Sequence, residues 1–513
     1  MLVEDQSVAI AYLRNPASHG ITSAVEVIET HISLIFLAGE KAYKLKRAVK
    51  LPYADFSTLE LRQRYCTAEL ALNGRTAPEI YCGVRRITQD ASGKISFDGD
   101  GKTIDYVVEM HRFSQDMLFD RMAERGQLSK ALLEETAERI ADFHRDAEVV
   151  HRNSGKENLS AVLDINEAAF SAVTLFNAEQ TTVLNARFRT ALDRHAPLLD
   201  ERVTAGMIRH CHGDLHLHNI FLGPEGPRMF DCIDFNENLA TSDILYDLAF
   251  LLMDLWHRNL PDFANTVVNR YLDRTGDDAG YGLFPFLLAL RAAIRAHVGA
   301  TQLRDLGDQT GHAAEEARAY RELALALLRE KEPVLVAIGG LSGSGKSTLA
   351  EAIAPRLGLA PGARLLESDR LRRAMLGHIR GVPMPADAYR PEVSTKVYAA
   401  LTEKSELVIN AGGSVVANAV FAHAGERQAI EQVAEKTGVR FVGLWLEADP
   451  SILRSRIETR PVTDSDATAD VLDQQLSQGT GEIDWIRLDA GKSRAWVARE
   501  ALALVTQARL SAG

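Results

Sequence analysis

A glycine-rich loop at residues 340–348, Gly-Leu-Ser-Gly-Ser-Gly-Lys-Ser-Thr, has the most specific chemistry in the sequence. It fills every fixed position of the pattern G-x-x-x-x-G-K-[ST], and it lies between an apolar run at 334–338 and a helical pattern that begins at Leu349. A strand that turns tightly into a helix leaves backbone N–H groups unpaired, and glycines let the chain wrap an anion with those groups pointing inward. A turn that only joins a strand to a helix, which is the alternative, needs none of these positions. The loop therefore predicts a site for a nucleoside triphosphate with magnesium.

Two side chains of this loop have predicted roles in chemistry. Lys346 is expected to neutralise the β and γ phosphates of ATP during transfer, and the hydroxyl of Ser347 is expected to complete the coordination shell of Mg²⁺. The rest of the loop cradles the phosphates. The residues expected to bind the nucleotide are Gly340, Ser342, Gly343, Ser344, Gly345, Lys346, Ser347 and Thr348.

A second polar cluster lies at residues 212–219, His-Gly-Asp-Leu-His-Leu-His-Asn, and Asp234 follows it. Two short apolar segments on either side of the turn Gly-Pro-Glu-Gly-Pro indicate a hairpin that joins this cluster to Asp234. On adjoining turns of that hairpin, Asp214 can serve as a general base, while Asn219 and Asp234 supply oxygen ligands for Mg²⁺. The alternatives are a zinc site, suggested by the histidines at 210, 212, 216 and 218, and a purely structural cluster.

This pattern resembles the catalytic loop of aminoglycoside phosphotransferases and of the wider eukaryotic-kinase-like fold, which reads HGDxxxxN followed by a metal-binding aspartate. The resemblance implies that Asp214 accepts the proton of the substrate hydroxyl and that Asn219 and Asp234 bind magnesium. It also implies that two downstream aspartates, Asp243 and Asp247, brace the loop. A plain structural cap is the alternative for Asp243.

The same resemblance assigns nucleotide contacts to the first part of the chain. Lys44 fits the strand lysine that contacts the α and β phosphates, and Glu69 on the following helical segment is its implied partner. Lys46 lies on the same face of the strand and is an alternative. No G-x-G-x-x-G loop precedes Lys44, where only the segment 30–33 and a turn at Gly39 are available. This departure favours, as an alternative, a weak phosphate grip or a lost activity.

In the last third of the chain, Asp369 and Arg372 follow a predicted strand, the place where ligands bind in open α/β sheets. They resemble the D-x-x-R element of small P-loop kinases, including polynucleotide kinases and zeta-type toxins, in which the aspartate activates the acceptor hydroxyl and the arginine holds substrate or phosphate. Arg456 and Arg460 resemble the lid of these kinases and share a helical face that suits a clamp on the transferring phosphoryl group. A solvated basic helix face is the alternative. The segment that ends at Asn418 resembles a strand that ends in an aspartate in many of these P-loop kinases.

The elements that would position these residues follow two different patterns. Strands at 32–37 and 42–46 around a turn, a helix at 58–73 and a strand at 104–110 predict a sheet-rich lobe, which mainly helical patterns follow up to residue 329. After residue 333, strands are expected at 364–367, 406–409, 413–416 and 440–446. Strands that alternate with helices predict a parallel sheet with helices on both faces.

We therefore predict two domains of α/β and α+β class. Residues 1–330 form a bilobal, protein-kinase-like domain similar to aminoglycoside phosphotransferases, with a small lobe at about 25–112 and a large helical lobe at about 113–330. The resemblance that implies this fold covers roughly residues 25–325. Residues 331–513 form a P-loop domain with a doubly wound parallel sheet.

The composition excludes several other classes of protein. The chain has 513 residues, of which 46% are hydrophobic and 25% charged, as in an ordinary globular protein. The formal net charge of −12 argues against a nucleic-acid or membrane-surface partner, because both need a basic field. The four cysteines form no CxxC pair, so neither a zinc ribbon nor a disulfide framework is expected. No window approaches the length of about 18 uncharged apolar residues, and no signal pattern opens the sequence. We expect a cytoplasmic location.

Three functions are compatible with these residues. The leading one is a bifunctional ATP-dependent kinase whose two halves each transfer the γ-phosphoryl group to a hydroxyl of a small molecule, with ATP and Mg²⁺ as cofactors. In the second, a degenerate kinase-like domain senses a ligand and regulates the P-loop half. The third, a nucleic-acid end kinase, rests on the D-x-x-R likeness and is opposed by the net charge. Sugars, amino alcohols and nucleosides fit equally well as acceptors, and no residue pattern points to an oligomeric state.

Overall fold

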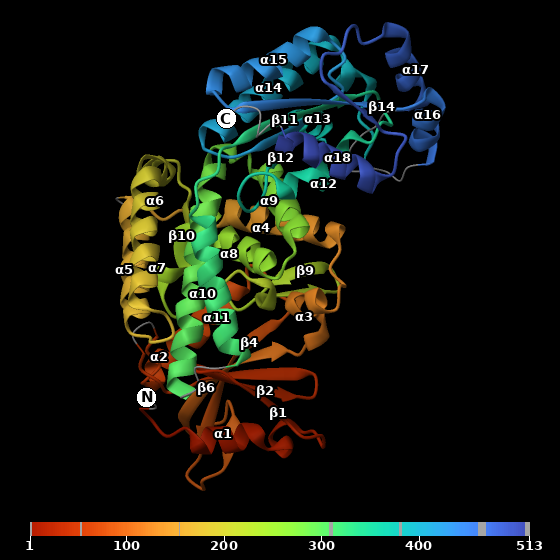
Figure 1. Cartoon of the computed structure of the whole chain (residues 1–513). Coiled ribbons are helices and arrows are strands. Elements are labelled where there is room, and N and C mark those ends of the chain that lie inside the picture. The colour runs from red at the N-terminus through yellow and green to blue at the C-terminus, as the bar shows by residue number, and fades with distance from the viewer. Residues whose placement is uncertain are drawn as a thin grey trace. The chain divides into compact units, whose positions relative to one another are not determined.

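The computed structural model describes residues 3–51, 54–152, 154–306, 311–378, 382–459 and 468–507 (Figure 1). The chain folds into two compact units, each made of two segments. Unit 1 consists of Met1–Gly155 and Asp200–Leu251, and unit 2 consists of Lys156–Leu199 and Leu252–Gly513. The domain boundary predicted at residues 330/331 lies inside unit 2 and stays a prediction.

Unit 1 contains a six-stranded sheet of order β1-β2-β3-β6-β4-β5, in which every neighbouring pair is antiparallel. The predicted strands near residues 32–46 and 104–110 are confirmed, and Gly39 forms the turn between β2 and β3 with a φ of +62°, which favours glycine. The strands are β1 (Glu26–Glu29), β2 (Ser33–Ala38), β3 (Lys41–Lys46), β4 (Tyr81–Gln89), β5 (Ile95–Phe97) and β6 (Lys102–His111).

Successive side chains of a strand point to opposite faces of the sheet, and in this sheet both faces carry apolar side chains. Leu34 and Phe36 of β2 pack on one face with α1 (Ser7–Arg14), while Leu37 of β2 and Ala42 of β3 pack on the other face with α2 (Leu59–Asn73). The hydroxyl of Thr58 accepts a hydrogen bond from the N–H of Leu61 and caps α2 at its N-terminus. Helix α2 thus lies on the sheet face to which Lys44 and Lys46 also belong.

The remainder of unit 1 is mainly helical, and it contains the polar cluster predicted on a hairpin. That hairpin is confirmed: β8 (Ile220–Gly223) pairs with β9 (Gly226–Met229) in antiparallel register. The other elements are η1 (Pro16–His19), η2 (Gln115–Met117), α3 (Phe119–Glu124), α4 (Lys130–Asp146), β7 (Ile208–His210), η3 (Leu217–Asn219), α7 (Glu237–Ala240), β10 (Thr241–Asp243) and α8 (Ile244–His257), which continues into unit 2.

Unit 2 contains the predicted parallel sheet, with five strands in the order β12-β13-β11-β14-β15. Its strands are β11 (Val334–Gly340), β12 (Arg364–Glu367), β13 (Val415–Asn418), β14 (Arg440–Glu447) and β15 (Ile486–Asp489). The strand predicted at 406–409 is wrong, because these residues form the last turn of α14 (Pro391–Asn410). Strand β15 was not predicted.

Several helices of unit 2 pack on this sheet, and others lie before it in the sequence. Buried side chains of β11, including Val336 and Ile338, pack against Leu349 and Ile353 of the helix that follows the loop. The helices are α5 (Gly155–Ser171), α6 (Ala178–Thr204), α9 (Pro261–Thr275), η4 (Asp278–Leu283), α10 (Phe284–Leu306), α11 (His312–Leu327), α12 (Lys346–Ile353), η5 (Ala354–Arg356), α13 (Ser368–Leu376), η6 (Ala386–Tyr389), α15 (Ala424–Thr437), α16 (Pro450–Thr459), α17 (Ala469–Gln478) and α18 (Arg494–Gln507).

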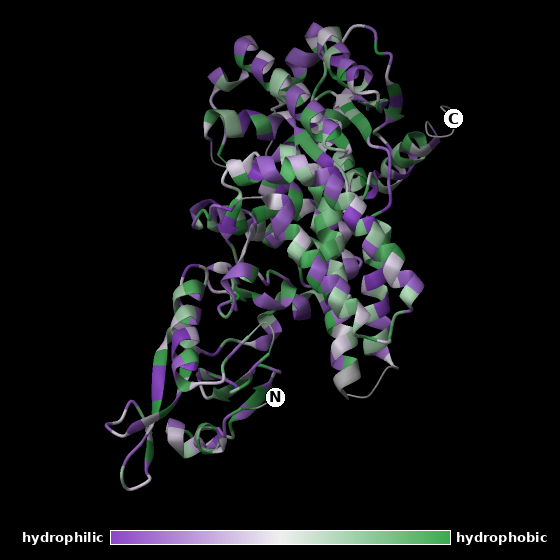
Figure 2. Cartoon of the chain, turned by 90° about the vertical axis from the view of Figure 1, so that its left-hand side faces the viewer, coloured by the Kyte–Doolittle hydropathy of each residue, from purple (hydrophilic) through white to green (hydrophobic). Residues whose placement is uncertain are grey.

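Hydrophobic and hydrophilic residues alternate along the helices, as expected for helices that bury one face and expose the other (Figure 2). Within the described residues, one helical stretch, Asp278–Leu303, is long and apolar enough to cross a membrane by length and composition alone. However, 72% of its apolar window is buried inside the protein, which is also the behaviour of a core helix.

The centre of the parallel sheet makes a first prediction about stability. Ile338 in β11 is fully buried, so Ile338→Ala should lower the free energy of unfolding by about 3 kcal/mol. Urea denaturation followed by circular dichroism measures this change. Val183→Ala, at a side chain that is 43% exposed, is the control and should change it by less than about 0.5 kcal/mol. Equal effects of the two variants would contradict the assignment of Ile338 to the core.

Candidate functional site

The phosphate loop of unit 2 joins β11 to α12 in a conformation that requires its glycines. Gly340, Gly343 and Gly345 have φ values of +141°, +81° and +91°. A Cβ atom at Gly340 would lie 2.7 Å from the carbonyl oxygen of Leu446, and one at Gly343 would lie 2.5 Å from that of Leu453. The tight wrap of the loop therefore excludes larger residues at these two positions, as a phosphate cradle made of backbone N–H groups demands.

Side-chain contacts hold this loop in place. The ammonium of Lys346 donates a hydrogen bond to the carbonyl oxygen of Leu341 at 3.1 Å, and the N–H of Ser342 donates to Oε1 of Gln475 in α17 at 2.9 Å. Helix α12 begins at Lys346, so its N-terminal N–H groups and positive dipole end face the loop. The arrangement provides an anion site with a lysine at its edge.

The steric requirement at Gly343 leads to a prediction about nucleotide binding. Gly343→Ala places a Cβ against a backbone oxygen at a φ that non-glycine residues rarely adopt, which costs about 1–3 kcal/mol of strain. We expect the affinity for ATP at this loop to fall by about tenfold or more in calorimetric titration. Gly425→Ala in α15 is the matched control, because nothing lies within 4 Å of its Cβ position and its affinity should be unchanged. Unaltered binding by Gly343→Ala would contradict the predicted site.

Three polar side chains meet beside the loop at the carboxyl ends of neighbouring strands. Nδ2 of Asn418, at the end of β13, lies 3.0 Å from Oγ of Ser347 and 2.7 Å from Oε1 of Glu367 at the end of β12. Glu367 is buried, and this burial raises the pKa of its carboxyl group. The hydroxyl of Ser347 and the carboxylate of Glu367 are hard oxygen ligands of the kind that Mg²⁺ accepts, and Asn418 donates a hydrogen bond to each, so this group fits the metal that a bound nucleotide would bring. Glu367 was not predicted, although its place as the last residue of β12 was a usable signal.

The predicted acceptor residues lie on α13, which follows β12 directly. Asp369 and Arg372 stand one turn apart on this helix. The guanidinium of Arg372 donates to the carbonyl oxygen of Ala388 at 2.7 Å and lies 4.9 Å from the ring centre of Tyr389. The structure thus places both residues beside the carboxyl end of the sheet, and their roles in transfer stay predictions.

The two arginines predicted for the lid have different outcomes. Arg456 lies on α16 and donates from Nη2 to the carbonyl oxygen of Ala490 at 2.8 Å, so its guanidinium reaches the segment that follows β15. Arg460 lies outside the described residues. The predicted clamp on the phosphoryl group therefore stays a prediction.

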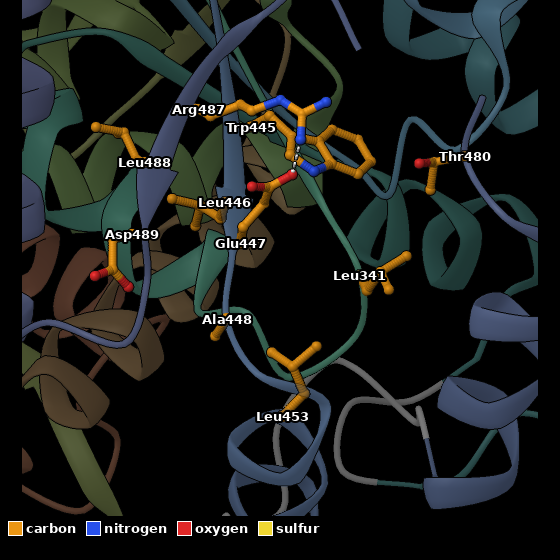
Figure 3. Close-up of a pocket in the computed structure, with 10 residues that line it drawn as sticks. All are labelled: Leu341, Trp445, Leu446, Glu447, Ala448, Leu453, Thr480, Arg487, Leu488 and Asp489. Atoms are coloured by element: carbon orange, nitrogen blue, oxygen red, sulfur yellow. Dashed lines mark hydrogen bonds and ion pairs between the residues drawn. The ribbon is translucent and has the colours of Figure 1, made fainter. Parts of the chain in front are cut away.

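A pocket of about 670 Å³ opens beside the loop, at the carboxyl ends of β14 and β15 (Figure 3). Its apolar wall includes Leu341 and Trp445, and its polar rim contains Glu447, whose carboxylate pairs with Nη1 of Arg487 at 2.7 Å. The remaining lining residues are Leu446, Ala448, Leu453, Thr480, Leu488 and Asp489. A cavity of this size with mixed lining suits a small polar molecule, and its location agrees with the rule for ligand sites in parallel sheets.

Unit 1 gathers part of the second predicted site, Lys44, Lys46 and Asp234, around the buried carboxylate of Glu69. Glu69 receives the ammonium of Lys44 on one oxygen and that of Lys46 on the other, each at 2.8 Å. Lys44 also contacts Asp231, and Lys46 contacts Asp234, both at 2.5 Å. Although burial opposes ionisation of Glu69, the two lysines lower the pKa of its carboxyl group to about 2. Both candidate lysines are therefore built into the site, and Asp231 is a member that the sequence analysis missed.

The catalytic loop is held from behind by Asp247. Its two carboxylate oxygens accept the backbone N–H groups of His212 at 3.1 Å and Gly213 at 2.8 Å, and Nε2 of His144 lies 3.1 Å from the first of these oxygens. Asp243 instead forms a two-bonded ion pair with Arg202, at 2.6 and 2.9 Å. Asp247 therefore braces the loop directly, while Asp243, the last residue of β10, ties that strand to Arg202 of α6.

Asp214 and Asn219 adjoin one another at the front of this loop. Nδ2 of Asn219 donates to Oδ2 of Asp214 at 2.9 Å and to its carbonyl oxygen at 3.0 Å. The side chain of Asp214 is 40% exposed and thus accessible to a substrate hydroxyl. The neighbouring histidines have different partners: Nε2 of His212 contacts the carbonyl oxygen of Phe230, Nε2 of His216 lies 3.4 Å from Oδ2 of Asp214, and Nδ1 of His218 contacts Asp120. This geometry supports the carboxylate interpretation of the cluster over the zinc alternative.

The environment of Asp234 predicts a pH dependence. Burial raises the pKa of this carboxyl group to about 6, above its usual value, while Lys46 opposes the shift. Below about pH 6 the group is protonated and cannot ligate a metal, so Mg²⁺-dependent ATP binding in unit 1 should strengthen as the pH rises from about 5 to 7. Calorimetry on the Lys346→Ala variant measures this change, because this variant should retain only the ATP site of unit 1.

The control for this experiment adds Asp234→Asn to the same variant. The amide does not titrate, so the remaining pH dependence should be that of ATP itself. If the profiles with and without Asp234→Asn are the same, Asp234 does not ligate the metal.

Comparison with known proteins agrees with the two kinds of site. Residues 101–284 match the model of the phosphotransferase enzyme family, and residues 335–480 match a model of the AAA domain family. The chain therefore fuses an N-terminal phosphotransferase-family domain with a C-terminal P-loop domain. The kinase-like N-terminal fold and the parallel P-loop sheet were predicted from the sequence, and both are confirmed.

Among individual proteins, an uncharacterized protein of Mycobacterium tuberculosis is 28% identical over 481 residues, which span 91% of this chain and 92% of that protein. A gluconokinase from Sinorhizobium meliloti 1021 is 27% identical and is covered to 96%, over 35% of this chain, with a TM-score of 0.26. A choline/ethanolamine kinase family protein from Mesorhizobium loti is 17% identical and is covered to 94%, over 63% of this chain, with a TM-score of 0.41.

Proposed function

We propose that this protein is a bifunctional ATP-dependent phosphotransferase that carries two separate phosphoryl-transfer sites. Each site transfers the γ-phosphoryl group of ATP, with Mg²⁺, to a hydroxyl group of a small molecule. The observation that carries the proposal is the phosphate loop of unit 2, in which Lys346 and Ser347 stand beside the carboxyl ends that bear Glu367 and Asn418. A loop of this kind with an acceptor-side helix is the arrangement of a kinase.

In unit 2, the residues divide between donor and acceptor. Lys346 and the N–H groups of the loop bind the β and γ phosphates, and Ser347 holds the metal ion. Asp369 accepts the proton of the attacking hydroxyl, and Arg372 holds the acceptor. The pocket beside Leu341 and Trp445 offers room for a small polar ligand.

In unit 1, Asp214 is the base that accepts the proton of the hydroxyl, since it is exposed and held by Asn219. Asn219 and Asp234 bind the metal ion, and Lys44 or Lys46 contacts the α and β phosphates. Each lysine would keep its contact with the buried carboxylate of Glu69 and offer a remaining N–H group to the phosphates.

A second candidate function, a sensor domain that regulates the P-loop half, is favoured by a specific observation. The turn between β2 and β3 consists of Gly39 and Glu40 alone, so this hairpin supplies no glycine-rich phosphate loop. In that case unit 1 would bind a ligand without transfer. A nucleic-acid end kinase is opposed by the net charge of −12.

We also propose a cytoplasmic location.

Two variants of the full chain separate these functions. Lys346→Ala should remove one ATP site in calorimetry, and Asp214→Ala should retain both sites but abolish transfer in unit 1. Screening a panel of sugars, amino alcohols and nucleosides for ATP-dependent phosphorylation identifies the acceptors. Lys436→Ala, at a side chain that is 68% exposed, and Asp142→Ala, at one that is 40% exposed, are matched controls without expected effect.

The outcomes are distinct. Two ATP sites and two acceptor activities, each lost in one variant, support the bifunctional enzyme. A single ATP site that Lys346→Ala abolishes supports the sensor. If neither substitution changes any transfer, the proposed function is wrong.

A further inference from the structure

The free edge of the parallel sheet in unit 2 is closed by α9, a helix that lies inside the segment matched by the phosphotransferase family. Strand β12 is an edge strand, and its outward backbone groups need partners. The side chain of Asn269 supplies them: its Oδ1 accepts the N–H of Leu365 at 2.7 Å, and its Nδ2 donates to the carbonyl oxygen of Ala363 at 3.3 Å. Asn265, one turn earlier, donates to the same carbonyl oxygen at 2.9 Å. Two amides of α9 thus take the place of a neighbouring strand.

A buried ion cluster joins the start of β12 to the same helix. Arg364 is 1% exposed, and its guanidinium lies 2.8 Å from Oδ1 of Asp273 at the end of α9 and 2.6 Å from Oδ1 of Asp278. Lys404 of α14 also contacts Asp278. A buried arginine is tolerated only when it is paired and hydrogen-bonded, so this contact is a permanent part of unit 2.

Asp273 also reaches the metal side of the phosphate loop through Arg370. The second oxygen of Asp273 lies 3.4 Å from Nη1 of Arg370, whose Nε lies 2.5 Å from Oε2 of Glu367. The other oxygen of Glu367 accepts the amide of Asn418, which contacts Oγ of Ser347. A continuous chain of polar contacts therefore runs from α9 to the hydroxyl that is expected to hold the metal ion.

We propose that Asp273 is a positioning residue for the metal side of the P-loop site, so that a helix of the phosphotransferase-family segment orients Glu367 and Ser347 for Mg²⁺. Asp273 touches neither nucleotide nor metal in this scheme and acts through Arg370. Arg370 also lies 3.4 Å from Oε1 of Glu351, so without the charge of Asp273 the guanidinium can shift toward Glu351, which alters its contact with Glu367. The inference rests on the proposed function of the P-loop site.

The test compares ATP binding with and without Mg²⁺ in the full chain, using only the binding component that Lys346→Ala removes. Outer contacts of metal ligands typically contribute about 10–100-fold to metal affinity. Asp273→Asn should therefore lower ATP affinity by about tenfold in Mg²⁺ and leave it unchanged in EDTA. A merely structural loss would weaken both measurements equally. Asp273→Glu, which retains the charge, should restore most of the Mg²⁺-dependent affinity.

Asp262→Asn is the matched control. Asp262 lies on the same helix and also pairs with an arginine of the P-loop part, Arg356 at 2.7 Å, but this pair is exposed and is not one of the contacts that link Asp273 to Ser347. This variant should behave as the unaltered protein. Thermal unfolding of each variant shows whether the fold is intact.

The outcomes separate this inference from the proposed function. If Lys346→Ala removes no ATP binding, the proposed function of unit 2 fails first. If it does remove binding, and Asp273→Asn equals Asp262→Asn in Mg²⁺, the positioning role is wrong. Should Asp273→Asn unfold below the assay temperature, Arg370→Lys decides: a loss of affinity confined to Mg²⁺ supports the proposal, and no such loss overturns it.

Discussion

The carboxylate of Glu69, buried between the ammonium groups of Lys44 and Lys46, constrains the whole site of unit 1. A buried charge that loses its partner costs several kcal/mol, so α2, β3 and the segment with Asp231 and Asp234 must be held in place together. The sheet meets this requirement because alternate residues of β2 and β3 pack against α2, and Lys44 and Lys46 point to that same face. The other residues of these strands pack on the opposite face. The two ammonium groups thus stand among three carboxylates, those of Glu69, Asp231 and Asp234.

The P-loop site of unit 2 obeys a related constraint through its backbone. Parallel strands bring polar groups together only at their carboxyl ends, and there Glu367 and Asn418 meet Ser347 of the loop. The edge strand β12, which carries Glu367, has α9 as its outer neighbour in place of another strand. Asn269 of α9 binds the backbone of β12, and Arg364 of β12 pairs with Asp273 of α9. The compact unit that contains the P-loop sheet therefore includes helices that the family comparison assigns to the phosphotransferase part.

The sequence predicts well what is encoded in one contiguous segment. The phosphate loop and the cluster around Asp214 have fixed local spacings, and the structure forms both as expected. Glu367 and Asp231 were missed because their neighbours come from other strands, and strand order is absent from a single sequence. The strand predicted at 406–409 failed because four apolar residues are too few to separate a strand from a buried helical turn.

A crystal structure with a non-hydrolysable ATP analogue and Mg²⁺ would test the claim that one chain carries two nucleotide sites. We expect two bound nucleotides. The triphosphate of one lies within residues 340–348 with the metal ion at Ser347, and that of the other lies beside Lys44 and Lys46 with the metal ion at Asp234 and Asn219. Density for a nucleotide in unit 2 alone, or metal ions bound by other residues, would contradict the claim.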